Sequence, residues 1–180
     1  MNSRASGNAV RVAASLPQRR VIFVPDRNLG DYVGRRLPDK ELVLWPGRCP
    51  VHARVRPADA ETLRARHPEA AMLVHPECDP AVVASADFVG STAEIINYAA
   101  KAAGREFIIG TEAGVLHKLG RARPDARFYL LHPDMVCPDM KKITLAGVYA
   151  ALATMQPAVT VEEGLARRAR AALDRMLELV

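Results

Sequence analysis

The stretch Met72-Leu73-Val74-His75-Pro76-Glu77-Cys78 holds the pattern on which the fold prediction depends. Its short apolar run, 72–74, predicts a buried strand. The run ends in a turn that carries a histidine, a carboxylate and a thiol, and residues 80–86 then predict a short helix. The same order of strand, polar turn and helix recurs along the chain, which favours an α/β fold.

Apolar runs alternate with helical patterns on both sides of this stretch. Strands separated by helices pair in parallel, so we expect a layered α/β architecture with short sheets. An S-x-x-E pair, from Ser91 to Glu94, and a T-x-x-E pair, from Thr160 to Glu163, predict helix capping boxes. Strands are expected at 21–24, 42–45, 72–74, 107–109 and 128–131. Helices are expected at 8–16, from the turn at 25–28 to about 37, and at 57–66, 80–86, 91–103, 112–119, 144–155 and 161–179.

Composition excludes several classes of protein. A hydrophobic content of 49% suffices for a core, in which Trp45 is expected to be buried. The net charge of +5 comes from scattered arginines without a run of like charges, which argues against nucleic-acid binding. We find no apolar stretch of the roughly 18 residues that a membrane span needs, and no apolar signal core. An odd number of cysteines favours a reducing compartment, so a cytoplasmic protein is expected.

Most of the chemically active side chains follow predicted strands. Ligands of parallel sheets collect beyond the carboxyl ends of the strands, where these segments should converge. Cys49, Cys78 and Cys137 each lie there, and their wide spacing fits either a metal or cluster site assembled from several strands or simple packing. The strand-end segments are 25–28, 49–52, 75–78, 110–112 and 132–137.

Two of these segments suggest specific chemistry. His75 and Glu77 lie two residues apart in extended chain and point to the same side, as an acid/base pair or as groups that orient a substrate; a solvated turn is the alternative. Ser91 and Thr92 begin a helix and could bind a carboxylate or phosphate, or Ser91 could simply cap the helix. A zinc hydrolase that uses His52, His75 and Glu77 is a further alternative, but it would lack the compact H-E-x-x-H motif.

Taken together, the segments resemble the quinolinate synthase family, the iron–sulfur enzymes of de novo NAD biosynthesis. The resemblance covers nearly the whole chain. Its motifs are PDRNLG at 25–30, WPGRCPVH at 45–52, HPEC at 75–78, DFVGST at 87–92, GTE at 110–112 and VCPDMKK at 136–142.

The resemblance implies a fold of three similar αβα domains around a pseudo-threefold axis. This chain would hold an incomplete second domain (1–52), the third domain (53–137) and C-terminal helices (138–180) that pack on the first domain. That first domain is not matched, so apolar surface should be exposed where it would lie. The implied reaction condenses iminoaspartate with dihydroxyacetone phosphate to quinolinate, and the enzyme that supplies iminoaspartate is an implied partner.

The resemblance also assigns roles to residues. Cys49 and Cys137 correspond to two of three ligands of a [4Fe–4S] cluster whose third cysteine is not in this chain, whereas Cys78 corresponds to a non-ligand. The substrate-binding positions are His75, Pro76, Glu77, Ser91, Thr92 and Ser6, with His75 and Glu77 catalytic. A truncated, non-catalytic metal- or anion-binding remnant is the alternative to an enzyme.

Overall fold

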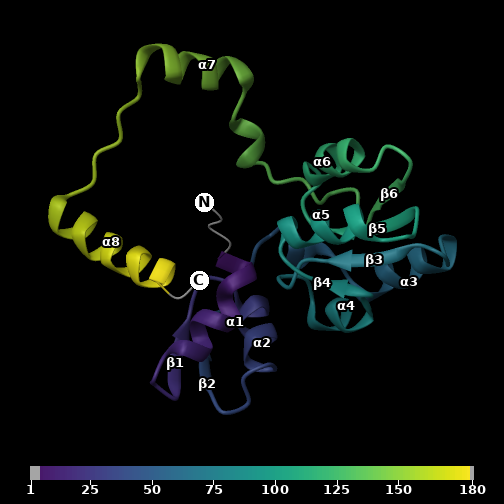
Figure 1. Ribbon diagram of the computed structural model, residues 1–180, viewed down its shortest axis with the longest axis horizontal. Coiled ribbons are helices and arrows are strands. Elements are labelled where there is room, and N and C mark those ends of the chain that lie inside the picture. Colours follow the sequence, from purple (N-terminus) through teal and green to yellow (C-terminus); the bar gives the residue numbers. More distant parts are fainter. Residues whose placement is uncertain (1–4, 179–180) are drawn as a thin grey trace. The chain divides into compact units, whose positions relative to one another are not determined.

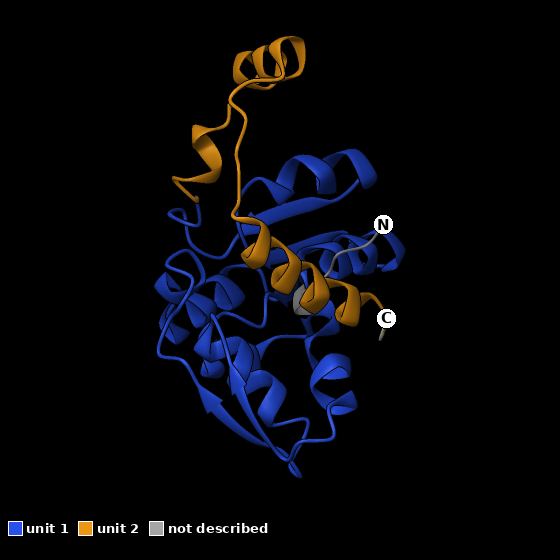
Figure 2. Cartoon of the chain, turned by 90° about the vertical axis from the view of Figure 1, so that its left-hand side faces the viewer, with its two compact units in different colours: residues 1–136 blue, residues 137–180 orange. Residues whose placement is uncertain are grey.

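The computed structural model describes residues 5–178, which divide into two compact units (Figure 2). The first unit extends to Val136 and contains both β-sheets. The second begins at Cys137 and contains only helical elements among the residues described.

A two-stranded parallel sheet opens the first unit. Strands β1 (Arg20–Phe23) and β2 (Glu41–Leu44) pair in register, and helices α1 (Ala5–Ser15) and α2 (Arg27–Gly34) pack with them. The small core between them consists of Ala13, Leu29 and Val33, with Phe23 and Leu42 packed against it.

The other face of this small sheet is apolar and exposed. Ile22 pairs with Val43 across the sheet and is 76% exposed, and Val24 is exposed beside them. Trp45, expected in the core, is 57% exposed, so that prediction is wrong. The reason is the alternation of side chains along a strand, which places Trp45 on the face opposite to α1 and α2. Parallel strands are normally covered on both faces.

The larger sheet has four parallel strands in the order β4-β3-β5-β6 (Figure 1). Strand β3 (Ala71–Val74) lies between β4 (Phe88–Val89) and β5 (Glu106–Gly110), and β6 (Arg127–Leu130) is at the edge. Val74 is in register with Gly110, so the central strands end side by side. This alignment brings the turns that follow β3 and β5 together.

Helices cover both faces of the larger sheet, as the α/β prediction requires (Figure 1). On one face, α5 (Thr92–Lys101) and α6 (Val115–Ala122) enclose a core that includes Leu73, Phe107 and Ile109. The alternate residues of β3 and β5 face α3 (Pro57–Arg66) and α4 (Pro80–Ser85). The three-layer arrangement is thereby confirmed, and the predicted boundary at residue 52 stays a prediction.

The second unit consists of a short 3-10 turn, η2 (Met140–Lys142), and two helices, α7 (Leu145–Thr154) and α8 (Glu163–Glu178). The predicted capping box from Thr160 is wrong, because the carboxylate of Glu162 accepts the N–H groups of Gly164 and Leu165 instead. No helix within residues 5–178 is long and apolar enough to cross a bilayer.

All but one of the described strands were expected from the sequence. The exception is β4, whose two residues, Phe88 and Val89, are too few to show a periodic pattern. Helix α6 begins later than predicted, because the Glu112 carboxylate accepts the Gly114 N–H and holds a turn before the helix. The capping box of α5 is confirmed: Ser91 and Glu94 each accept the other's backbone N–H.

Candidate active site

Three segments meet where β3 and β5 end. The turn 75–78 follows β3, and its first N–H donates to the carbonyl of Gly110, which extends the ladder by one bond. Thr111 follows β5 at the same level. The third segment is the 3-10 turn η1 (His52–Arg54), which comes after β2 and brings His52 to the end of the larger sheet.

His52 lies at the centre of this meeting point. Its Nδ1 is 2.9 Å from Oε2 of Glu77, and its Nε2 is 3.1 Å from Oγ1 of Thr111. The imidazole is buried, at 7% exposure for the residue, and both ring nitrogens are hydrogen-bonded. A hydroxyl, an imidazole and a carboxylate are thus connected in a single line.

A second imidazole stacks on the first. The rings of His52 and His75 are 4.4 Å apart between centroids and inclined by 6°. Nδ1 of His75 accepts the backbone N–H of Glu77 at 3.3 Å, so in its neutral form this ring carries its proton on Nε2. Nδ1 of His75 is 3.8 Å from Oε2 of Glu77, so the two side chains lie on the same side, as expected. The expected extended chain is wrong, because the Cys78 N–H donates to the His75 carbonyl and closes a turn.

The two histidines differ in protonation. Burial disfavours the charged form of His52, but its interactions with Cys49 and Glu77 outweigh burial and raise its pKa to about 9. Burial, with the charge of the adjacent ring, lowers the pKa of His75 to about 4. The pKa of Glu77 is lowered, although burial opposes it, because His52 hydrogen-bonds to the carboxylate. At neutral pH the cluster thus combines a His52–Glu77 ion pair with a neutral His75.

Cys49 adds a soft donor to this cluster. Its Sγ, a ring nitrogen of His52 and a carboxylate oxygen of Glu77 lie within 4.8 Å of one another. The pKa of the half-buried thiol is lowered, because the neighbouring imidazole stabilises the thiolate. A thiolate, an imidazole and a carboxylate at this spacing could hold a metal ion.

The start of α2 positions both halves of the site. The buried carboxylate of Asp26 accepts the Leu29 N–H at 2.9 Å, which caps the helix, and the Cys49 N–H at 2.7 Å, which fixes the thiol-bearing loop. Asn28 donates from Nδ2 to the carbonyl of Glu77 at 2.9 Å. One helix terminus therefore holds the segments that follow β2 and β3 in the same place.

Cys78 has a different environment from Cys49. It is fully buried, its thiol donates to the carbonyl of Gly110 at 3.4 Å, and burial raises its pKa to about 12. These properties suit a packed thiol and do not suit a metal ligand, which must be deprotonated. Within the described residues, none of the three cysteines forms a disulfide.

The remaining expected residues lie in varied places. Oγ1 of the exposed Thr92 is 3.4 Å from Oγ1 of Thr111, so Thr92 extends the line that runs through His52 to Glu77. The hydroxyl of the buried Ser91 donates to Glu94 within the capping box of α5. Pro76 faces away from His52, into a cavity on the other side of the turn. Cys137 belongs to the second unit. The side chain of Ser6 lies outside the described residues.

The roles of two residues were not predicted from the sequence. His52 and Thr111 were expected in strand-end segments, but His52 was considered only for a zinc hydrolase and Thr111 was given no role. The available signal was the position of His52, three residues after Cys49 and beyond the same strand. The sequence could not show that η1, which follows the small sheet, reaches the end of the larger sheet where β3 and β5 end.

Comparisons with known proteins identify the family of this chain. Residues 4–178 match the family model described as NadA, quinolinate synthetase A protein. The chain is 47% identical over 174 residues to the quinolinate synthase of Caldicellulosiruptor saccharolyticus, a match that covers 97% of this chain and 57% of that protein. It is 48% identical, with the same coverage, to the quinolinate synthases of Alkaliphilus metalliredigens and Geobacter metallireducens. The chain thus spans little more than half the length of these curated relatives.

Replacing Asp26 tests the link between α2 and the Cys49 loop. Asp26→Ala removes a helix cap and leaves the Cys49 N–H without an acceptor, so we expect it to lower the free energy of unfolding by about 2–4 kcal/mol. Asp79→Ala is the matched control, because the Asp79 side chain caps α4 through the Ala81 N–H alone. We expect this variant to lower the free energy of unfolding by about 1 kcal/mol. Urea unfolding measures both, and equal losses would contradict the dual role of Asp26.

His75 should make stability depend on pH. Its pKa lies below its ordinary value of 6.5 in the folded chain, so the unfolded chain takes up the proton first as pH falls. Stability should fall by up to about 3 kcal/mol between pH 6.5 and pH 4. His75→Asn, whose amide oxygen can still accept the Glu77 N–H, should show a smaller loss in urea unfolding at these pH values. Parallel curves for the two proteins would refute the burial of a neutral imidazole.

Proposed function

The chain belongs to the quinolinate synthase family, and from that premise we propose that it provides the acid–base centre of a quinolinate synthase. The reaction proposed is the condensation of iminoaspartate with dihydroxyacetone phosphate to quinolinate, with loss of phosphate and water. The proposal rests above all on the line from Thr111 through His52 to Glu77. We further propose that the protein works in the cytoplasm, a reducing compartment that suits cysteines outside disulfides.

A hydroxyl, an imidazole and a carboxylate in line form an arrangement that moves protons in other enzymes. Here the raised pKa of His52 leaves both ring nitrogens protonated at neutral pH, with one N–H directed at Glu77 and the other at the Thr111 oxygen. Glu77 keeps the ring oriented and charged. Thr111 can then pass its own hydroxyl proton to a departing substrate oxygen as it takes one from His52, which is general acid catalysis.

Two neighbouring groups are suited to hold substrate. Neutral His75 has its Nε2–H available, because Nδ1 accepts the Glu77 N–H, and a neutral ring can donate to a substrate oxygen. Thr92 lies at the start of α5, where backbone N–H groups and the helix dipole favour a carboxylate or phosphate, and its hydroxyl is near Thr111. We propose that these two residues orient the anionic substrates. Pro76, Ser91 and Ser6 remain proposed substrate-binding positions from the family resemblance.

The cysteines fit the iron–sulfur cluster of the family in part. Cys49 suits a ligand, since its thiolate is favoured and half-exposed, and Cys137 is proposed as a second ligand by motif. Cys78 does not fit, because it is buried with a raised pKa. The third ligand would come from the part of the family's sequence that this chain does not match. When bound, such a cluster would supply a Lewis acid to the site.

A second candidate function has one observation in its favour. Cys49, His52 and Glu77 are close enough to bind Zn²⁺, which accepts thiolate, imidazole and carboxylate ligands. A chain that bound Zn²⁺ through these residues would be a non-catalytic metal-binding protein. The metal would occupy the His52 nitrogen and the Glu77 carboxylate, which the line from Thr111 through His52 to Glu77 (the proton line) needs. The metal content of the purified protein separates this candidate from the enzyme.

Cysteine variants test the ligand assignment. The chain would be co-expressed with the part of the Caldicellulosiruptor saccharolyticus protein that it does not match, and reconstituted without oxygen. Cys49→Ser and Cys137→Ser should each reduce bound iron and sulfide severalfold and abolish quinolinate formation, since each removes a thiolate. Cys78→Ser is the control, and it should keep the cluster because a serine hydroxyl can replace the bond to Gly110.

The outcomes separate the two candidate functions. Iron and sulfide in the complemented protein, with quinolinate formed only there, support the synthase. Stoichiometric zinc that disappears in Cys49→Ser, without cluster or product in any sample, supports the metal-binding protein. Loss of the cluster in Cys78→Ser alone would overturn the assignment of ligands.

A further inference from the structure

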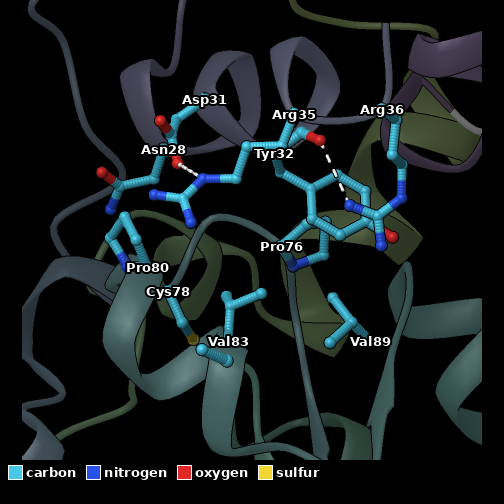
Figure 3. Close-up of a pocket in the computed structure, with 11 residues that line it drawn as sticks. Asn28, Asp31, Tyr32, Arg35, Arg36, Pro76, Cys78, Pro80, Val83 and Val89 are labelled. Atoms are coloured by element: carbon cyan, nitrogen blue, oxygen red, sulfur yellow. Dashed lines mark hydrogen bonds and ion pairs between the residues drawn. The ribbon is translucent and has the colours of Figure 1, made fainter. Parts of the chain in front are cut away.

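A cavity of about 220 Å³ lies behind the turn that carries Glu77, on the side away from His52. Figure 3 shows side chains of α2 on one side of it and side chains of α4 and β4 on the other, with Pro76 between them. The volume equals roughly seven water molecules at the density of the liquid. That is room for one small organic molecule.

The cavity has an apolar floor. Val83 and Val89 point into it from below in Figure 3, and the ring of Pro76 contributes a flat wall. The ring of Tyr32 lies on the opposite side, from α2. A flat ligand can therefore lie between aliphatic groups and an aromatic face, an arrangement typical of small-molecule sites.

The rim of the cavity is cationic. The Arg36 guanidinium lies 3.5 Å from the centroid of the Tyr32 ring and donates to the Tyr32 carbonyl at 3.2 Å. Arg35 donates from Nε to Asp31 at 2.8 Å, which neutralises that carboxylate. In the described part of the chain the other N–H groups of Arg35 and Arg36 have no protein acceptor, and paired N–H groups of this kind match a carboxylate.

The cavity and the active site share one turn. His75 and Glu77 face His52, while Pro76 and Cys78 line the cavity on the other side of the turn. Asn28 also lines the cavity and donates to the carbonyl of Glu77. A molecule in the cavity would thus touch both neighbours of Glu77 and the side chain that holds its backbone.

We propose that this cavity binds a small planar carboxylate and that its occupancy is coupled to the position of Glu77. The ring of the ligand lies between Tyr32 and the two valines, and its carboxylate meets the guanidinium of Arg36. The site goes beyond the proposed synthase activity, because none of its polar side chains belongs to the proton line. Any shift of Pro76 or Asn28 on binding moves Glu77 relative to His52, and by linkage the state of the active site alters the affinity of the cavity.

Benzoate is the probe that tests the binding site. Titrated into the full chain and followed by NMR, it should bind saturably, and the uncharged analogue benzamide should bind about tenfold more weakly. Arg36→Gln should weaken benzoate about tenfold by removing the cation, and Val83→Phe should abolish binding by filling the cavity. Arg121→Gln is the matched control, because it removes the same charge from an exposed position on α6 and should bind benzoate as the wild type does.

The same titration measures the coupling between the cavity and the active site, through the NMR signals of the His52 and His75 imidazoles. Saturation with benzoate should shift them in the wild type, and Asn28→Ala should bind benzoate with a smaller shift. Thermal unfolding identifies any variant that fails to fold, in which case the comparison of Arg36→Gln with Arg121→Gln decides the matter. Absence of benzoate binding, or equal affinity in those two variants, overturns the site; binding that leaves both imidazoles unshifted overturns the coupling.

Discussion

The hydrogen bonds of His52 hold this part of the protein together. The residue follows the small sheet, and its two ring nitrogens bond to Glu77 and Thr111, which follow strands of the larger sheet. One buried imidazole therefore joins three segments that are far apart in sequence. Asp26 and Asn28 support the same junction through the backbone of Cys49 and Glu77. If the imidazole were removed, the hydroxyl and the carboxylate would no longer be connected.

The hydrogen bond between His52 and Glu77 is strong because both side chains are charged and largely withdrawn from water. Burial alone would neutralise His52, and the nearby carboxylate and thiol reverse that tendency. Breaking a buried pair leaves an uncompensated charge, which typically costs about 3–5 kcal/mol. The stacked His75 accommodates the cation by remaining neutral. The electrostatic arrangement thus explains both the stability of the junction and its capacity to deliver a proton.

Much of the fold could be predicted from the sequence, because apolar runs and helix signals are local. The strands near 72–74 and 107–109 and the capping box from Ser91 to Glu94 were readable in this way. The two-residue strand β4 was not, and neither was the exposure of Trp45, since exposure depends on which elements cover the small sheet. The roles of His52 and Thr111 were missed because they arise from contacts 25 and 59 residues apart along the chain.

His52 and Glu77 act as one charged unit. A double-mutant cycle measures this directly, with urea unfolding at neutral pH of the wild type, His52→Asn, Glu77→Gln and the double variant. We expect a coupling energy of about 2 kcal/mol or more, because either single change leaves a buried charge without its partner. Losses that add within about 0.5 kcal/mol would show that the two side chains are independent and would contradict the coupling.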